Sequence, residues 1–207
     1  FAGPVLEGVH VAERVLKLPG ARNADWLRLL SMQAVHARSA GRLDEGRTLF
    51  EQALAQAKAL GLRRGEYAAR ISLNGLRWAR GQIQEALAEY QTLTALCDAS
   101  GDRQLEGVAR RDWGYLFFDQ GRADEALKQW EIALRIAQET GQRKEEGEVQ
   151  GNIALCKTFL GQAATSLEHS RAALSIHREL GNRHAECRLL SNMGMQLSEQ
   201  GREDEAS

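Results

Sequence analysis

Proline and long apolar runs are scarce in this sequence. The two prolines, Pro4 and Pro19, lie near its start, so the rest of the chain has no proline that would interrupt a helix. No apolar run approaches the roughly 20 residues that a membrane-spanning helix needs, and no signal peptide is visible. We therefore expect a cytoplasmic protein with no membrane partner.

Cysteine usage favours the same compartment. Cys97, Cys156 and Cys187 are odd in number, lie far apart and form no C-x-x-C pair. This pattern is typical of free thiols in a reducing cytosol, and a disulfide or a metal site is the less favoured alternative.

The sequence also lacks an excess of charge of either sign. Its 27 Lys and Arg residues against 28 Asp and Glu residues give a formal charge of -1. Nucleic-acid binding usually needs a basic excess, so we expect no direct nucleic-acid partner. The charged residues accompany many Ala, Leu and Gln residues, which are good helix formers, and this composition favours an all-α fold.

Glycine recurs with a spacing of twenty residues. It stands at positions 41, 61, 81, 101, 121, 141, 161, 181 and 201. A glycine just past a helix can adopt the left-handed conformation that ends the helix without a Cβ clash. Each interval leaves room for a helix of about 25 Å at 1.5 Å per residue. The intervals alternate in type, so the repeating unit is forty residues with two helices.

The two interval types carry different residues. The type that follows Gly121 opens with acidic residues, which suit a helix N-terminus, and then alternates small and bulky positions. The bulky position holds Phe50, Tyr90 and Trp130 in three units, but Ser170 in the fourth. The other type carries an Arg and, three residues later, a Glu, which predicts surface ion pairs at Arg63/Glu66, Arg103/Glu106, Arg143/Glu146 and Arg183/Glu186.

This spacing resembles the tetratricopeptide repeat (TPR). The best match is the series Trp113, Gly114, Gly121, Ala126, Trp130 and Ala133. The usual repeat has about 34 residues. The 40-residue form is similar to the arrays of kinesin light chain, of bacterial signal-transduction ATPases and of maltose-regulator-like transcription activators. HEAT and armadillo repeats lack the Gly and Ala spacing. The resemblance implies an all-α, right-handed superhelical solenoid of antiparallel helix hairpins.

The repeat defines the expected domain organisation. We predict one TPR-like array over residues 1–207. It comprises a half repeat at 1–20, complete repeats at 21–60, 61–100, 101–140 and 141–180, and a truncated repeat at 181–207. Neither end resembles the polar capping helix that arrays need, so we expect a fragment of a longer protein.

Neither the glycines nor the histidines are arranged in a known catalytic motif. The sequence contains no phosphate-binding loop, no nucleophile elbow and no H-E-x-x-H motif. His169 and His177 are eight residues apart on one predicted helix, too far to share a metal, and we expect them in solvent or in a groove. We predict no enzyme activity, no metal site and no cofactor.

A polar ladder is the main candidate site. Stacking places the first helices of successive units along a concave groove, where Ser72, Asp112, Asn152 and Asn192 share one phase. In the 40-residue relatives, asparagines at this position often hydrogen-bond the backbone of an extended peptide, which the resemblance implies for Asn152 and Asn192. The alternative is that each residue caps a helix or bridges to the next one.

Arg111, Tyr115, Phe118 and Arg188 complete the predicted groove. Arg and Tyr are frequent anchors at protein interfaces. By contrast Trp113, Phe117, Trp130 and Tyr90 lie on core phases, where we expect packing.

The predicted function is non-catalytic binding of a peptide or protein segment in this groove. The chain would then be the interaction or sensor arm of a larger regulatory protein. One alternative is a sugar-like small-molecule sensor in a transcriptional regulator or a signal-transduction ATPase. Another is self-association through exposed apolar ends.

Overall fold

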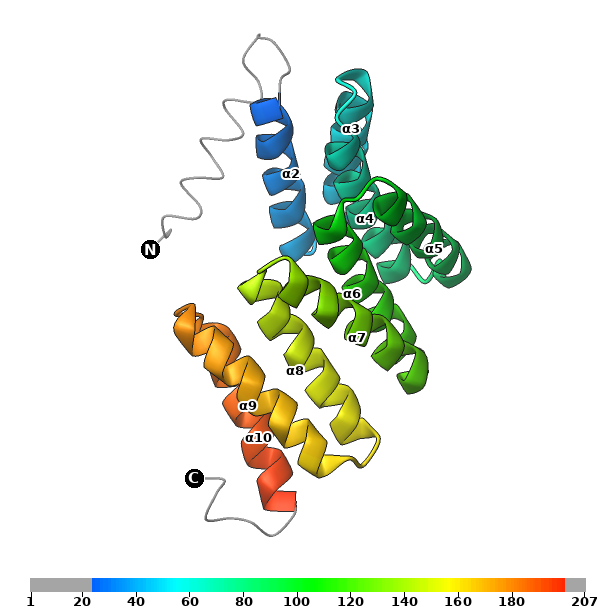
Figure 1. The fold of residues 1–207 in the computed structure, drawn as a ribbon. Helices are drawn as coiled ribbons and strands as arrows, with labels where there is room; N and C mark the ends of the chain where they lie inside the picture. Colours follow the sequence, from blue (N-terminus) through cyan, green and yellow to red (C-terminus); the bar gives the residue numbers. More distant parts are fainter. Residues whose placement is uncertain (1–23, 200–207) are drawn as a thin grey trace. The chain divides into compact units, whose positions relative to one another are not determined.

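The computed structural model describes residues 24–199, and all regular structure in this range is helical (Figure 1). The helices in chain order are α2 (Ala24–Ser39), α3 (Leu43–Ala59), α4 (Arg63–Ala79), α5 (Ile83–Ala99), α6 (Arg103–Asp119), α7 (Ala123–Glu139), α8 (Arg143–Phe159), α9 (Ala163–Glu179) and α10 (Arg183–Glu199). The half repeat predicted at 1–20 and the last residues, 200–207, of the truncated repeat predicted at 181–207 lie outside the described residues.

The chain forms two compact units, which are described separately. Unit 1 ends at Leu93 and unit 2 begins at Thr94, so the division falls within α5. The prediction of one continuous array therefore stays a prediction.

The predicted glycine turns are confirmed at all eight described positions. Gly41, Gly61 and their successors to Gly181 have φ between 65° and 77°. At Gly121 the backbone N–H donates to the Phe118 carbonyl at 2.9 Å, and the next N–H, of Arg122, donates to the Phe117 carbonyl at 3.0 Å. This Schellman pattern satisfies carbonyls that the end of α6 leaves without helical partners.

In unit 1, helices α2, α3 and α4 pack by placing bulky side chains of one helix against small residues of its neighbour. Phe50 of α3 is buried with Ala34 of α2 and Leu76 of α4. A Cβ added to Gly46 would stand 3.3 Å from the Ala34 carbonyl oxygen, so α2 and α3 approach closely there. In the following hairpin the Asn74 side-chain amide of α4 donates to the Ala86 carbonyl of α5 at 2.9 Å.

Unit 2 contains the α6–α7 and α8–α9 hairpins, with α10 packed against α9 (Figure 1). Trp130 of α7 and Ile153 of α8 belong to its core. The core assignment of Phe117, Trp130 and, in unit 1, Tyr90 is confirmed, whereas Trp113 is half-buried.

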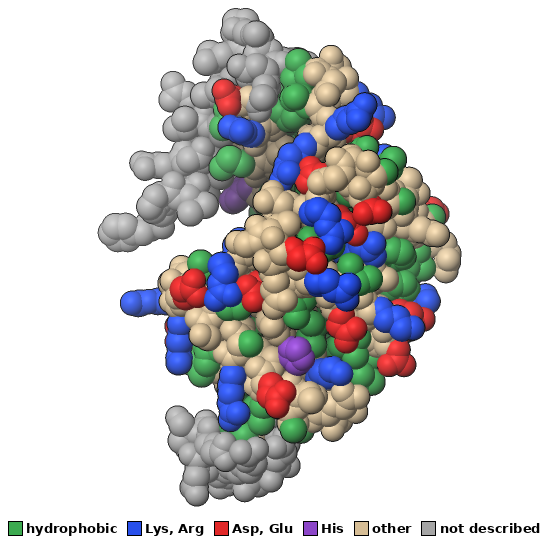
Figure 2. Space-filling view, viewed as in Figure 1, with side chains coloured by type: hydrophobic (Ala, Val, Ile, Leu, Met, Phe, Trp, Pro, Cys, Tyr) green, Lys and Arg blue, Asp and Glu red, His purple; other side chains and the backbone are tan. Residues whose placement is uncertain are grey.

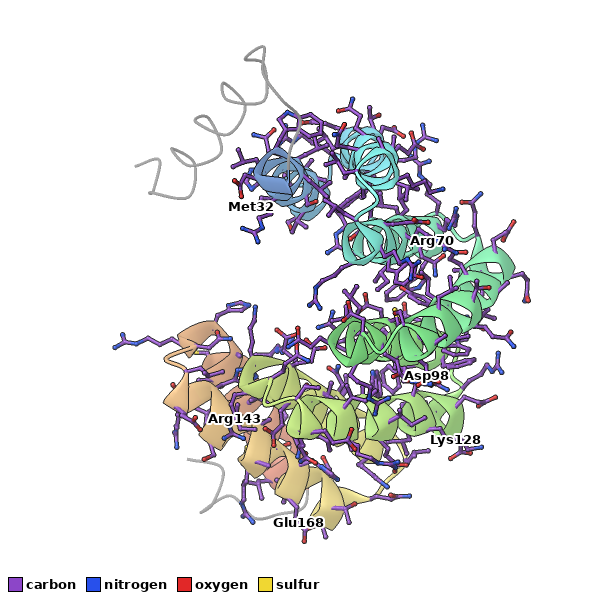
Figure 3. All side chains as sticks on the ribbon, turned by 45° about the horizontal axis from the view of Figure 1, so that its top comes forward. Met32, Arg70, Asp98, Lys128, Arg143 and Glu168 are labelled. Atoms are coloured by element: carbon purple, nitrogen blue, oxygen red, sulfur yellow. The ribbon has the colours of Figure 1, made fainter. Side chains whose placement is uncertain are left out.

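Two of the predicted arginine–glutamate pairs form and also close their hairpins. Arg103 and Arg143 contact Glu106 and Glu146 three residues on. The same two arginines bind glutamates at the last turn of the returning helix, Glu139 at 3.0 Å and Glu179 at 2.7 Å. Figure 3 labels Arg143 in the first turn of α8.

The prediction that these pairs lie on the surface was wrong for Glu106. This carboxylate is buried, and Arg103 and Arg110 both bind it. Glu66 and Glu186 pair instead with Lys58 and Arg178, which belong to the preceding helices. A three-residue spacing cannot distinguish these alternatives, because the competing arginine or lysine comes from another part of the sequence.

Gly121→Ala is expected to destabilise the fold through its backbone alone. No atom lies within 4 Å of an added Cβ, so the cost is the left-handed φ of 71°, about 1–2 kcal/mol. Gly151→Ala is the matched control, because Gly151 lies inside α8 and its added Cβ makes an ordinary 3.6 Å contact with Leu189. That change should stabilise by about 0.5–1 kcal/mol. Urea unfolding followed by circular dichroism measures both, and shifts of the same sign would contradict the role of the turn.

Candidate functional site

Arg111 anchors a cluster of charges between α6 and α8. Its guanidinium donates to Asp112 at 2.9 Å, to both oxygens of Glu145 at 2.8 Å and to Glu148 at 2.9 Å. Burial alone would lower the pKa of Arg111, but the three carboxylates raise it, so the side chain keeps its charge. Burial raises the pKa of Glu145, and Arg111 opposes that shift. Arg111 therefore joins α6 to α8, while Asp112 pairs with Arg111 on the same helix.

Tyr115 and Asn152 make a second link between the same helices. The Tyr115 hydroxyl donates to Asn152 Oδ1 at 2.6 Å, and Asn152 is only 5 % exposed. Burial raises the pKa of Tyr115, while Arg111 and the bond to Asn152 oppose that rise. At Asn152 the structure thus shows a bridge to a neighbouring helix, α6, which precedes α8 in the chain. Bridging between helices is the alternative to ligand contact at this position. Its buried Nδ2 has no hydrogen-bond partner among the described residues.

Phe118 lies at the apolar end of α6. Its ring centroid is 5.7 Å from that of Trp130 and 5.7 Å from that of Phe159. Phe159 is 65 % exposed at the last residue of α8. Phe118 is therefore half covered by the protein, and its neighbour presents an uncovered ring beside it.

A pocket opens between α8, α9 and α10 in unit 2. Its volume is about 160 Å³, and its main lining residues are Ala154, Leu155, Ser170, Leu189, Asn192 and Met195. Asn192 is exposed at the rim, together with Leu155 at 45 % and Met195 at 60 % exposure. This pocket includes one of the predicted groove residues and combines apolar walls with an amide, as ligand sites commonly do.

The remaining predicted residues lie apart from this pocket. Arg188 is exposed on α10, one turn before Asn192 on the same helix face, and forms no ion pair within the described range. Ser72 belongs to α4 in unit 1, where its hydroxyl donates to the Ala68 carbonyl at 3.0 Å. Unit 1 also exposes Met32 on α2, which Figure 3 labels.

Sequence reasoning missed several residues that shape this face of unit 2. Glu145 and Glu148 lie 34 and 37 positions from Arg111, so no local pattern connects them to it. Leu155 shares the phase of Tyr115, forty residues on, and that equivalence could have identified it. Ser170 was visible as a break in the series of bulky residues.

The charges around these helices are mixed in sign. Basic and acidic side chains are interspersed over the face that Figure 2 shows. Within residues 24–199 no group of three His, Cys, Asp or Glu side chains is arranged to hold a metal ion. No helix in that range is long and apolar enough to cross a membrane. Cys97 and Cys156 are buried and Cys187 is exposed, and none of the three forms a disulfide within residues 24–199.

His177 occupies an interior position, so the expectation of a solvent or groove histidine was wrong. It is 1 % exposed at a phase where Ala57 and Ala137 stand in other repeats. Gly147 makes room for it, because an added Cβ there would be 3.1 Å from His177 Nε2. Burial lowers the pKa of His177; Glu148 raises it and Arg188 lowers it further.

Comparison with known proteins identifies the fold. No family model matches the sequence, and no curated protein matches it. A putative kinesin light chain of P. anserina with nearly identical TPR-like repeats has a TM-score of 0.65 and 18 % identity, over 90 % of this chain and 92 % of that one.

Two regulatory proteins have similar structures. One is a Signal Transduction ATPase with Numerous Domains (STAND) from Pyrococcus horikoshii with a tetratricopeptide repeat sensor. It has a TM-score of 0.67 and 12 % identity over 91 % of this chain and 29 % of its own. The other is the Rap conjugation gene regulator of plasmid pLS20 in complex with the Phr* peptide. It has a TM-score of 0.70 and 15 % identity over 87 % of this chain and 50 % of its own.

These similarities confirm the prediction of an all-α TPR-type solenoid of helix hairpins. At identities this low they show the fold alone. The chain spans only 29 % and 50 % of the lengths of the two proteins, so the activities of those whole proteins do not transfer to it.

His177 is expected to make stability depend on pH. Its pKa in the folded protein is below the unfolded value of about 6.5, so the unfolded chain binds more protons when the pH falls below that value. The free energy of unfolding should therefore be highest above pH 6.5 and fall as the pH drops toward 5, by up to about 1.4 kcal/mol per pH unit per histidine. Burial lowers the pKa of His169 too, which adds a slope of the same sign.

The variant His177→Ala, which copies Ala57 and Ala137, should make this slope shallower. Urea unfolding at pH 7.5, 6.5, 5.5 and 5.0 measures the slope for both proteins. Parallel pH curves for the variant and the unmodified chain would show that His177 is not the titrating group.

Proposed function

We propose that this chain is a non-catalytic interaction module, and that unit 2 binds an extended segment of a partner protein across α8 and α10. The observation that carries the proposal is the exposure of large apolar side chains around a pocket. Leu155 and Met195 are each about half exposed or more at its rim, and Phe159 is exposed one turn beyond Leu155 on α8. Exposed apolar groups gathered on one face are characteristic of interaction sites.

Polar groups beside the pocket are suited to a peptide. The Asn192 amide offers both a donor and an acceptor, which matches the backbone of an extended segment. Arg188 lies one turn away with an exposed guanidinium, which favours a carboxylate on the bound segment. Of the groove residues predicted from the sequence, Asn192 and Arg188 are therefore the two that we propose make polar contacts with the peptide.

The other residues predicted in unit 2 take a supporting role in this proposal. Arg111 holds α6 against α8 through charge-assisted bonds to Glu145 and Glu148, and the Tyr115–Asn152 hydrogen bond adds a neutral link. Asp112 orients the Arg111 guanidinium from the same helix. A binding face on helices held in this way needs little ordering when the partner arrives, which reduces the entropic cost of association. Phe118 supports the exposed ring of Phe159.

The similar structures support the same function. The plasmid regulator with the Rap fold was solved with a peptide bound, and the STAND protein carries its repeats as a sensor. We accordingly propose that the chain serves as the interaction arm of a larger regulatory protein.

Selection of peptides from a random displayed library on the 207-residue chain tests this proposal. Peptides that bind should weaken about 3- to 10-fold on Asn192→Ala, as expected for loss of one neutral hydrogen bond, and at least 10-fold on Arg188→Glu. Fluorescence anisotropy with labelled peptides gives the dissociation constants. Lys128→Glu is the matched control, because Lys128 is exposed on α7, as labelled in Figure 3, and should leave binding unchanged.

Peptides that bind all three variants equally would place the site elsewhere. A library that yields no binder, together with a metabolite that raises the melting temperature of the chain, would favour the small-molecule sensor instead. Binding of the chain to itself, seen as a concentration-dependent mass in light scattering and lost in Met195→Glu, would favour self-association.

A further inference from the structure

The pocket in unit 2 lies where the repeat loses its bulky residue. The same position of the forty-residue unit holds Phe50, Tyr90 and Trp130 in three hairpins, and all three side chains are at most 2 % exposed. In the α8–α9 hairpin the position holds Ser170, which lines the pocket. The pocket is thus the space that a core side chain fills elsewhere in the chain.

The surroundings of Trp130 show that the correspondence extends to the walls. Trp130 Nε1 donates to the Arg111 carbonyl at 3.0 Å, and its ring lies against Gly114, Tyr115 and Phe118 of α6. The residues forty positions later on α8 all line the pocket: Gly151, Ala154, Leu155 and Thr158. The α8 residues that line the pocket are therefore the repeat equivalents of the α6 residues that contact the Trp130 ring.

The size and chemistry of the pocket suit one uncharged ring. An apolar cavity of about 150 Å³ in a protein accommodates benzene, and this pocket measures about 160 Å³. The Thr158 hydroxyl is already bonded to the Ala154 carbonyl and the Ser166 hydroxyl, so it does not need a polar occupant. Leu155 and Met195 are exposed at the rim, so the pocket opens on the proposed binding face.

Residue 154 selects a phenyl ring over an indole. In the α6–α7 hairpin an added Cβ on Gly114 would stand 2.4 Å from Trp130 Nε1, so the indole needs a glycine there. The corresponding residue on α8 is Ala154, whose Cβ blocks an indole placed in this way. The chain itself shows which ring an alanine permits, because Ala34 packs against Phe50 in the α2–α3 hairpin.

We propose that this pocket binds the phenyl side chain of a phenylalanine in the partner segment, where it takes the place of the missing core residue at position 170. The inference rests on the proposed function and specifies its anchor residue. Asn192 at the rim then binds the peptide backbone beside the phenylalanine, and Arg188 binds a carboxylate about one helical turn away.

A small probe tests the pocket without a peptide. N-acetyl-phenylalanine methylamide at millimolar concentration should shift the methyl NMR signals of Leu189 and Met195, and the tryptophan analogue should shift them at least about threefold less at equal concentration. Ser170→Phe recreates the Ala34 and Phe50 combination, so it should fold, raise the melting temperature and abolish these shifts. Ser170→Ala is the matched control, because it removes the hydroxyl but leaves the space.

Ser170→Leu provides a second way of filling the pocket if the phenylalanine variant unfolds. Methyl signals that respond equally to the probe in the filled variants and the unmodified chain would overturn the proposal. So would a stronger response to the tryptophan analogue.

Selected peptides then connect the pocket to binding. Binders should contain a phenylalanine whose replacement by alanine weakens affinity at least about 30-fold, as for an anchor in a desolvated pocket. The same peptides should lose affinity by a similar factor on Ser170→Phe and keep it within about threefold on Ser170→Ala.

The two proposals fail in distinguishable ways. Peptides that depend on Arg188 and Asn192 but bind Ser170→Phe normally would overturn the phenyl anchor and support the binding face. A probe that enters the pocket of a chain for which no peptide can be selected would support the phenyl selectivity of the pocket but overturn its occupation by a partner protein.

Discussion

The fit between a small residue on one helix and a bulky residue on its hairpin partner controls how closely the two helices approach. Gly114 receives Trp130, and Ala34 receives Phe50. Each pair is a local contact inside one hairpin, so a change at one position alters the local packing and leaves the turns and helix ends as they are. A short residue at a bulky position can therefore leave a pocket without disturbing the helices, as at Ser170.

The helices and the glycine turns between them could be predicted from the sequence because the residues that determine them are close together in the chain. Glycine at a helix end, acidic residues in the next turn and an unbroken run of helix formers are all read within one interval. They predicted the turns at Gly41 to Gly181, which all have the left-handed φ. Burial of Tyr90 and Trp130 followed from their phase, because the repeat gives every position a known side.

The site could be predicted only in part, because phase identifies a face but not the partners of a side chain on it. Asn152 and Asn192 share one phase. Asn152 is nevertheless buried and accepts a hydrogen bond from Tyr115, whereas Asn192 is exposed at the rim of the pocket. The difference arises from the preceding first helix of each unit, which supplies Tyr115 opposite Asn152 and Leu155 opposite Asn192. Ser170 was recognisable as a departure, but its consequence depended on whether Met195 and Leu189 would close over the space.

The turns of equal length and equal backbone conformation also affect how such a chain can evolve. Duplication, deletion or exchange of a forty-residue segment returns every later residue to its former phase, because each junction ends in the same left-handed glycine. A pocket can therefore arise from one substitution that shortens an interior side chain. Ser170 lines a pocket at the position where Trp130 is buried in the α6–α7 hairpin, and a larger side chain at position 170 would fill it.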